Sequence, residues 1–488
     1  MCLSITSPEV SRSFPLNQLT TFEDTRAALR EGRTTCEEVT LGYLAAIEKG
    51  KRLNAFLSVF RDRAIEHARQ VDRKIAGGTG GRLAGMVVAV KDVICMKGER
   101  VTCGSRILEN FISPYDATVI GRLLAEDAIL VGKTNMDEFA MGSSTENSAF
   151  GPVRNPVDEN RVPGGSSGGS CVAVAAGMAH TALGTDTGGS IRQPASFCGI
   201  VGLKPTYGRV SRYGLVALSS SFDQIGPFAN SVADAARILE VIAGHDASDS
   251  TSAQVPVPEY LNALDKNVSG VRVGVPFDVL REGVQPEVRQ AVETVLDRLR
   301  SGGAVIEEIT MPHFRYTISA YYILMTAEAS SNLARYDGAR YGYRSPGARD
   351  LIETYVRSRS EGFGEETKRR IMLGTYVLSA GYYDAYYRKA QKVRRLIQKD
   401  FFDAFRIVDC IVMPTSPTTA FRFGEKVDDP LQMYLSDVYT VSANLAGVPA
   451  ISVPAGEDNT GLPIGVQFIG KQFDEQTILK VADYEHTR

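Results

Sequence analysis

The sequence contains no long hydrophobic run and no strong excess of charge of either sign. No apolar stretch approaches the roughly 20 residues that span a bilayer, and the N-terminus has no apolar core typical of a signal peptide. The net charge of −3 over 488 residues gives no sign of the basic surface on which strong nucleic-acid binding depends. These absences favour a cytoplasmic protein and argue against a membrane-spanning or strongly nucleic-acid-binding one.

Paired cysteines and a phosphate-binding loop are also missing. The seven cysteines, an odd number without CxxC spacing, argue against a disulfide framework and are expected to be small core residues in a reducing compartment. The segment most similar to a phosphate-binding loop is Gly132-Lys133-Thr134, but Asp127 stands where that motif requires its first glycine. We therefore expect no nucleotide, metal or other cofactor in this chain.

Two turns rich in glycine and serine lie within one segment of the chain. The range 164–170 reads GGSSGGS and the range 187–190 reads TGGS, with the alanine-rich range 172–182 between them. Because glycine has no Cβ, such turns let backbone N–H groups approach a ligand closely. A single turn of this kind is a flexible loop about as often as it is part of a binding site, whereas two such turns in one segment indicate a functional site.

The second turn is predicted to place Ser190 at the start of a helix. The pattern predicts a helix over 168–178, a strand over 180–186 and a second helix whose first turn contains Pro194. The first N–H groups of a helix have no intrahelical partners and can stabilise a developing oxyanion. We therefore predict that Ser190 is a nucleophile, with an oxyanion hole formed by the backbone N–H groups of Thr187, Gly188, Gly189 and Ser190.

A nucleophilic serine needs a base, and none of the five histidines has a distinctive setting in the sequence. Lys91 ends the apolar run 86–90, which predicts an interior strand. Burial there would lower the lysine pKa from its usual value of about 10.4 and leave a neutral amine able to act as a base. The alternative is that Lys91 only pairs with Asp92, and the chemistry alone leaves both interpretations open.

These motifs together resemble the amidase signature family, and the similarity extends from about residue 15 to the C-terminus. The catalytic triad of that family is a nucleophilic serine, a bridging serine that follows a cis peptide bond, and a lysine. Its two serines are 24 residues apart, which matches Ser166 and Ser190 rather than Ser167 or Ser170. The resemblance implies that Lys91 accepts a proton from Ser166, that Ser166 accepts one from Ser190, and that an acyl-enzyme forms and is hydrolysed.

Within the family, three segments resemble the glutaminase subunits of tRNA-dependent amidotransferases; they are the ranges 132–139, 202–214 and 368–374. This resemblance implies that Arg370 and Asp437 bind the charged groups of glutamine, with Tyr321 as a weaker addition. From the residues alone, Arg370 is better interpreted as part of a solvated helix face and Asp437 as a surface or capping carboxylate. Asp186 and Arg192, which flank the nucleophile, are predicted to form an ion pair that fixes the loop rather than to act in catalysis.

The same resemblance implies partners for this chain. A B subunit would use ATP and Mg²⁺ and would make the main contacts with tRNA, and a small C subunit would complete a heterotrimer. Ammonia released from glutamine would convert misacylated Glu-tRNA(Gln) or Asp-tRNA(Asn) to the amide form, and the sequence leaves open which of the two is served. The alternatives are a free-standing amidase acting on another small amide, and a scaffold that retains the fold without catalysis.

Strand and helix patterns alternate along most of the chain. They predict an α/β fold with one many-stranded mixed sheet covered by helices on both faces, and the resemblance implies the same. We expect a single domain over 1–488, with an N-terminal helical layer over about 16–78, a signature core over about 83–230 and a C-terminal part over about 270–488. Helices are expected to dominate from about 315 to 405.

Overall fold

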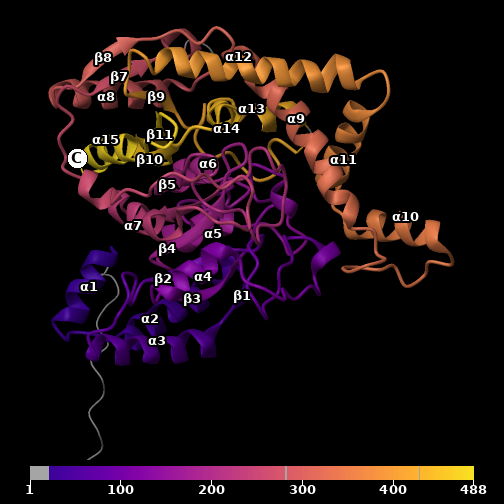
Figure 1. The fold of residues 1–488 in the computed structure, drawn as a ribbon, viewed down its shortest axis with the longest axis horizontal. Helices are drawn as coiled ribbons and strands as arrows, with labels where there is room; N and C mark the ends of the chain where they lie inside the picture. Colours follow the sequence, from indigo (N-terminus) through magenta and orange to yellow (C-terminus); the bar gives the residue numbers. More distant parts are fainter. Residues whose placement is uncertain (1–20, 281–282, 428, 488) are drawn as a thin grey trace, which may run out of the picture.

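A computed structural model describes residues 21–280, 283–427 and 429–487. The first residues of the predicted helical layer, 16–20, lie outside these ranges. In the described part of the chain, no helix combines the length and the apolar character needed to cross a membrane. Figure 1 shows the N-terminal helices at one end of the molecule and a group of long helices from the second half of the chain on another side.

An eleven-stranded sheet runs through the described part of the chain, in the order β1-β3-β2-β4-β6-β5-β10-β11-β9-β7-β8. Parallel pairs, such as β2 with β3 and with β4, occur beside antiparallel pairs such as β10 with β11. The predicted mixed α/β sheet is therefore confirmed. The strands are β1 (Phe56–Val59), β2 (Val87–Lys91), β3 (Ile129–Thr134), β4 (Thr181–Thr185), β5 (Val201–Lys204), β6 (Ile225–Ala229), β7 (Arg272–Val275), β8 (Val305–Glu308), β9 (Cys410–Pro414), β10 (Ala450–Glu457) and β11 (Pro463–Gly470).

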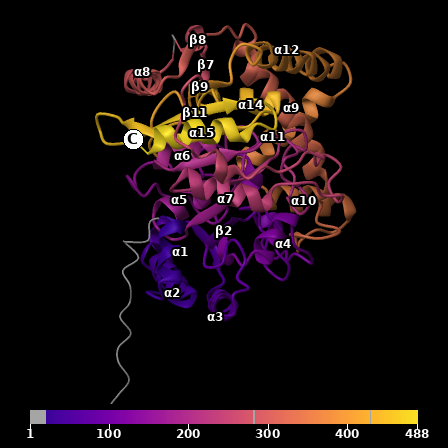
Figure 2. The same ribbon diagram turned by 60° about the vertical axis from the view of Figure 1, so that its left-hand side comes forward.

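Helices pack against both faces of this sheet (Figure 2). They are α1 (Phe22–Arg30), α2 (Cys36–Lys49), α3 (Arg61–Ala76), α4 (Thr118–Ala125), α5 (Gly168–Ala175), α6 (Arg192–Cys198), α7 (Val232–Ile242), α8 (Pro286–Ser301), α9 (Thr317–Asn332), α10 (Leu351–Gly362), α11 (Glu365–Leu378), α12 (Lys389–Ala404), α13 (Pro430–Leu435), α14 (Val441–Ala446) and α15 (Glu475–His486). A π-helical segment labelled η9 (Tyr383–Arg388) leads into α12.

Alternate side chains of the central strands enter two separate cores. In β2, Val88 and Val90 join the larger cluster, which includes residues of α7 and α15, whereas Val87 and Ala89 join a second cluster with residues of α2 and α5. Because every residue of β2 is buried, the strand reads as a continuous apolar run rather than as an alternating one. A lysine at the end of such a strand is therefore forced into the interior.

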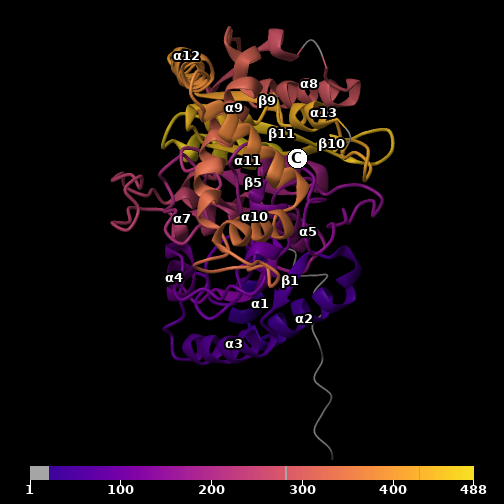
Figure 3. The same cartoon turned by 90° about the vertical axis from the view of Figure 1, so that its right-hand side faces the viewer.

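The helices α9 to α12 form a layer on one side of the sheet (Figure 3). The helices α9 and α11 lie against each other, and a Cβ on Gly374 of α11 would come within 1.9 Å of the carbonyl oxygen of Thr326 on α9. Only glycine permits this close approach. The contact fixes α11, and with it Arg370, relative to the sheet.

Candidate active site

Lys91 lies at the end of β2 and is completely buried. Its Nζ donates hydrogen bonds to Ser166 Oγ, Ser167 Oγ and Thr185 Oγ1, each over 2.8 Å. Burial lowers the pKa of Lys91 to about 7, although nearby carboxylates oppose this change. The alternative partner, Asp92, is instead held by Lys133 at 3.1 Å, so the interpretation that Lys91 only pairs with Asp92 is wrong.

Ser166 follows a cis peptide bond from Gly165, as the resemblance implies. A Cβ on Gly165 would come within 2.2 Å of Asp137 Oδ2, so this turn excludes any side chain there. The backbone N–H of Asp137 also donates to the Ser166 carbonyl oxygen over 3.2 Å. The predicted helix begins directly after this turn, as α5, but ends at Ala175 rather than at 178.

Ser190 lies two residues before α6, whose third residue is Pro194, as the sequence predicts. Ser190 is 8% exposed, and its hydroxyl has no hydrogen-bond partner in the described part of the chain. The turn before it is tightly enclosed: a Cβ on Gly188 would come within 2.5 Å of Tyr321, and one on Gly189 within 2.3 Å of Thr440 Oγ1. Both glycines are therefore required by the packing around the turn.

The structure leaves fewer backbone N–H donors available for the oxyanion hole than the sequence predicts. The N–H of Gly189 donates to Asp186 Oδ1 over 2.9 Å, so it is not available to a ligand. The N–H groups of Thr187, Gly188 and Ser190 make no hydrogen bond to other described residues. Three of the four expected donors thus remain, and the prediction is wrong for Gly189.

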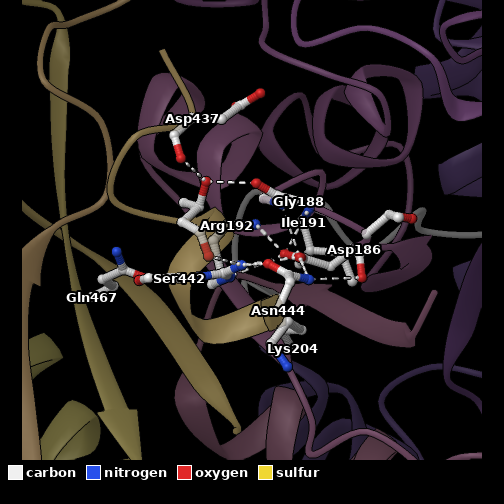
Figure 4. Close-up of polar contacts among 12 residues, drawn as sticks. Asp186, Gly188, Ile191, Arg192, Lys204, Asp437, Ser442, Asn444 and Gln467 are labelled. Atoms are coloured by element: carbon white, nitrogen blue, oxygen red, sulfur yellow. Dashed lines mark hydrogen bonds and ion pairs between the residues drawn. The ribbon is translucent and has the colours of Figure 1, made fainter. Parts of the chain in front are cut away.

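Asp186 and Arg192 form the predicted ion pair, and both side chains are completely buried. Two nitrogens of Arg192 contact the two oxygens of Asp186, each over 3.0 Å, and Arg192 also reaches Gln467 and Asn444 (Figure 4). Burial alone would raise the pKa of Asp186, but the guanidinium of Arg192 outweighs it and the pKa falls to about 2. The pair is saturated with partners and fixes the loop, which leaves it no role in proton transfer.

Arg370 points inward from α11 and is 3% exposed, so the alternative of a solvated helix face is wrong. Its Nε donates to Glu366 Oε1 over 2.8 Å, and its guanidinium lies 5.5 Å from the ring centres of both Tyr322 and Tyr434. The Nη1 atom has only the sulfur of Met325 as a partner in the described part of the chain, at 4.0 Å. A planar cation with an unused edge is suited to bind a carboxylate.

Asp437 is also buried, so the alternative of a surface carboxylate is wrong. Its Oδ2 accepts a hydrogen bond from Ser143 Oγ over 2.6 Å and a longer one from Tyr322 over 3.4 Å. Burial raises the pKa of Asp437 to about 7, because it outweighs the effects of Ser143 and Arg370. A second positive charge in this site would stabilise the ionised carboxylate.

The predicted glutamine-binding residues lie beside the turn that precedes the predicted nucleophile. The hydroxyl of Thr440 donates to the carbonyl oxygens of Gly188 over 2.7 Å and of Asp437 over 3.0 Å, which joins the two segments. Tyr321 packs against Gly188 from α9, and its ring is 5.1 Å from that of Tyr322. The structure thus brings together predicted residues from six separate parts of the sequence.

Residues of this arrangement that were not predicted from the sequence include Ser143, Thr185, Tyr322, Glu366 and Thr440. A signal existed for Thr185, because it ends β4, and β4 is parallel to β2 and hydrogen-bonded to it. The ends of neighbouring parallel strands meet at one edge of a sheet, so strand pairing would have placed Thr185 close to Lys91. A signal existed for Glu366 as well, because it lies four residues before Arg370 in a predicted helical stretch and such residues are neighbours on a helix. No comparable sequence pattern marks the others.

Neither histidine nor a metal site takes part in this arrangement. Nδ1 of the buried His180 lies 3.0 Å from the backbone N–H of Val87 and its Nε2 lies 2.7 Å from Thr25 Oγ1, so both ring nitrogens are occupied by groups outside the site. Within the described ranges, no group of three or more His, Cys, Asp or Glu side chains could hold a metal ion. The chemistry that this geometry supports is therefore serine nucleophilic attack assisted by a buried lysine.

Several known proteins are similar to this chain in sequence and in fold. The A subunit of the Glutamyl-tRNA(Gln) amidotransferase of Koribacter versatilis is 58% identical over 464 residues, which cover 95% of this chain and 97% of that protein. The crystal structure of the A subunit of the same kind of amidotransferase from Thermotoga maritima is 45% identical, with a TM-score of 0.76 and coverage of 92% of this chain and 90% of that one. The peptide amidase from Stenotrophomonas maltophilia is 32% identical, with a TM-score of 0.80 and coverage of 96% and 97%.

A family model described as Amidase matches residues 38–479, which include the lysine, both serines and the two charged residues at the turn. Because this match spans most of the chain and the solved structures share its fold, the chain belongs to the amidase family.

Proposed function

We propose that this chain is the glutamine-hydrolysing subunit of a tRNA-dependent amidotransferase and acts through a Ser190–Ser166–Lys91 triad. The observation that carries the proposal is the contact between the buried Lys91 and Ser166, next to a turn flanked by Arg370 and Asp437. The relatives that are named as A subunits of Glutamyl-tRNA(Gln) amidotransferases support the assignment of the reaction.

The reaction begins with Lys91 as a neutral amine. Lys91 takes the proton of Ser166, Ser166 takes the proton of Ser190, and Ser190 Oγ bonds to the side-chain amide carbon of glutamine. The N–H groups of Thr187, Gly188 and Ser190 bind the resulting oxyanion, and each such donor is worth about 100- to 1000-fold in rate. The Ser166–Ser190 hydrogen bond forms when glutamine binds, since catalytic hydrogen bonds often tighten only in the substrate complex.

The tetrahedral intermediate collapses when the amide C–N bond breaks and the proton returns through Ser166 to the leaving nitrogen. This step releases ammonia and leaves a glutamyl ester on Ser190. Water then attacks the ester, gives its proton to the same relay, and yields glutamate and the free serine. Each proton that Lys91 accepts is returned within the cycle, so no external acid or base is consumed.

Substrate recognition rests on two buried charges of opposite sign. The unused edge of Arg370 binds the α-carboxylate of glutamine, Asp437 binds its α-ammonium, and Tyr321 forms part of the wall between them and the turn. A peptide amide or an apolar amide would bury the unused edge of Arg370 and the carboxylate of Asp437 without giving either an ionic partner from the substrate. Buried charges without partners cost several kcal/mol, so the site favours free glutamine over the substrates of a free-standing amidase.

The released ammonia then serves a second reaction on partner subunits. We propose that a B subunit binds the misacylated tRNA and activates its carboxylate with ATP and Mg²⁺, and that a small C subunit completes the heterotrimer. Glu-tRNA(Gln) is the proposed acceptor because the relatives carry that name. Since aminoacyl-tRNA is used in the cytoplasm, the proposal also locates this reaction there.

The test is to measure glutamine hydrolysis by the purified chain alone and with the B and C subunits from the same source. We expect weak hydrolysis by the lone chain and a strong increase in the complex when ATP and Glu-tRNA(Gln) are present. Ammonium chloride should replace glutamine in the complex that carries Ser190→Ala. Full glutaminase activity without partners would instead support a free-standing amidase, and ATP turnover or tight tRNA binding by the lone chain would contradict the division between subunits.

A further inference from the structure

One buried glutamine contacts both of the turns that are rich in glycine and serine. Gln193 is the second residue of α6, three residues after Ser190, and it is completely buried. Its backbone N–H donates to the carbonyl oxygen of Gly189 over 2.8 Å, and its side-chain Oε1 accepts from the N–H of Gly165 over 3.0 Å. Gln193 therefore joins the turn before the proposed nucleophile to the turn that holds the bridging serine, Ser166.

The other end of the same side-chain amide leads to the substrate site. Nε2 of Gln193 donates to the backbone carbonyl oxygen of Ser143 over 2.8 Å, and the hydroxyl of Ser143 donates to Asp437 over 2.6 Å. Ser143 and Asp437 are both buried. A continuous series of contacts thus runs from the carboxylate proposed to bind the α-ammonium to the turn that holds Ser166.

The orientation of this amide is fixed by its partners. One partner is a carbonyl oxygen and the other an N–H, so a rotated amide would bring two donors together and two acceptors together. The first turn also lies directly against the amide, because a Cβ on Gly164 would come within 2.4 Å of Gln193 Oε1. Since buried polar groups lose free energy when they lose their partners, we expect the turn and the amide to move together.

The proton relay lacks one contact in the described part of the chain, the hydrogen bond between Ser166 and Ser190. Gln193 spans the two segments that must approach each other to form this bond. Their separation is critical, because a misplacement of about 1 Å can lower the rate of an enzyme about 100-fold. A residue that fixes this separation can control the rate without contacting the substrate.

We propose that Gln193 positions the bridging serine, Ser166, against Ser190. Through Ser143 it also transmits the occupation of Asp437 to the relay, which tightens when the α-ammonium of glutamine binds. The ammonium adds a charged donor to the carboxylate that Ser143 already contacts, so one end of this series of contacts changes with substrate. This inference rests on the proposed function, because that function supplies both the α-ammonium and the relay. Small amides without an α-ammonium would then react slowly even when they bind.

The alternative is that Gln193 only satisfies buried backbone groups, and the chain offers a matched control in Gln224, which is 1% exposed. The Nε2 of Gln224 donates to the carbonyl oxygen of Val210, and its Oε1 accepts from the N–H of Gly208, each over 3.0 Å. Loss of either amide removes the same kinds of contact from the interior. Only the amide of Gln193 reaches the Ser166 turn and the substrate carboxylate.

The test compares glutamine with glutaramic acid, which is glutamine without its α-amino group. Both substrates are assayed on wild type, Gln193→Met and Gln224→Met, each in complex with the B and C subunits from the same source. The ratio of kcat/KM for the two substrates reports the advantage that the α-ammonium gives, because losses shared by both substrates cancel.

We expect Gln193→Met to lower kcat for glutamine about 100-fold with little change in KM. The substrate ratio should fall at least about tenfold in this variant and stay within about twofold of wild type in Gln224→Met, because independent sites behave additively. Should Gln193→Met fail to fold by circular dichroism, Gln193→Asn and its control Gln224→Asn test the same contacts, because an amide one methylene shorter cannot reach both partners.

A second measurement needs no turnover. In the complex that carries Ser190→Ala, calorimetry measures glutamine binding, and mass spectrometry follows hydrogen exchange in the peptide that contains Gly165. Glutamine should slow this exchange, and Gln193→Met should abolish the slowing while Gln224→Met retains it.

Two kinds of result would overturn the proposal and leave the proposed function in place. One is a substrate ratio that is unchanged in Gln193→Met or falls equally in Gln224→Met. The other is a glutamine-dependent slowing of exchange that persists in Gln193→Met. A wild-type complex that binds glutamine without hydrolysing it would instead contradict the proposed function, and the exchange measurement would still decide the role of Gln193. A complex that does not bind glutamine at all would overturn both.

Discussion

Replacing Lys91 by methionine should destroy activity and stabilise the folded protein at neutral pH. Methionine keeps the length and the apolar stem of lysine but carries no charge. Burial lowers the pKa of Lys91 from 10.5 to about 7, so the folded state disfavours the ammonium form. At about 1.4 kcal/mol per pKa unit, this difference corresponds to about 5 kcal/mol of destabilisation below pH 7.

The pH dependence of this effect has a definite sign. Between pH 7 and 10.5 the unfolded chain binds a proton at Lys91 that the folded protein does not, so the free energy of unfolding rises with pH in this window. The destabilisation that Lys91 causes in the wild type therefore shrinks by about 3 kcal/mol between pH 7 and 9. The Lys91→Met variant has no titrating group at this position, so its stability lacks this pH dependence. The variant also removes the hydrogen-bond partner of the hydroxyls of Ser166, Ser167 and Thr185. Each lost bond lowers the free energy of unfolding by about 1 kcal/mol at every pH. The variant should thus be about 2 kcal/mol more stable near pH 6.5 and lose this advantage by pH 9.

Urea unfolding of both proteins between pH 6.5 and 9 measures this difference, and the same samples are assayed for glutamine hydrolysis. Loss of a general base should reduce kcat/KM by about 100- to 10,000-fold. Below pH 7, wild-type kcat/KM should fall with decreasing pH, because the neutral form of Lys91 becomes scarce. A stability difference that does not change with pH, or a variant that retains activity, would refute the reasoning.

The other predictions concern the nucleophile, the substrate site and the buried histidine. Ser190→Ala should lower kcat at least about 1000-fold and trap no acyl-enzyme in rapid-quench mass spectrometry, and a detectable ester would contradict the assignment. Arg370→Ala and Asp437→Ala should each raise KM for glutamine about 100-fold, because a buried partner charge is left unpaired, while ammonium-dependent transfer persists; a normal KM would remove these residues from the site. His180→Ala should lower the free energy of unfolding by about 2–4 kcal/mol with unchanged kcat, and a folded but inactive variant would reopen the search for the base.

Local patterns in the sequence predict the elements that carry the site. The apolar run that ends at Lys91 is β2, and the strand predicted over 180–186 is β4 (Thr181–Thr185). The glycine and serine content identifies the two turns, and the 24-residue spacing that the family resemblance implies selects Ser166 and Ser190 within them. The strands β5 and β6 were missed, since both are short and β6 contains Pro227 at its centre, which usually argues against a central strand.

Contacts between distant segments could not be predicted in the same way. Ser143 donates to Asp437 across 294 residues, and Tyr322 on α9 donates to the same carboxylate across 115 residues. Such contacts depend on how elements pack, and a single sequence does not encode packing as a visible period. The loss of Gly189 as an oxyanion donor is a similar case, because the competing carboxylate of Asp186 is fixed by Arg192.

The number of charges buried in this site explains why its surroundings are so densely hydrogen-bonded. Lys91, Asp186 with Arg192, Arg370 and Asp437 are all 5% exposed or less. A buried ion pair seldom stabilises a fold compared with apolar residues of the same shape, and a lone buried charge destabilises it. The pair at Asp186 is satisfied on every side and is rigid, whereas Asp437 makes no ion pair in the described part of the chain and is held only by hydrogen bonds from Ser143 and Tyr322. Burying Lys91, Arg370 and Asp437 therefore lowers the stability of the fold, but it keeps these groups available to glutamine and to the proton relay. The Asp186–Arg192 pair holds the loop beside them in place.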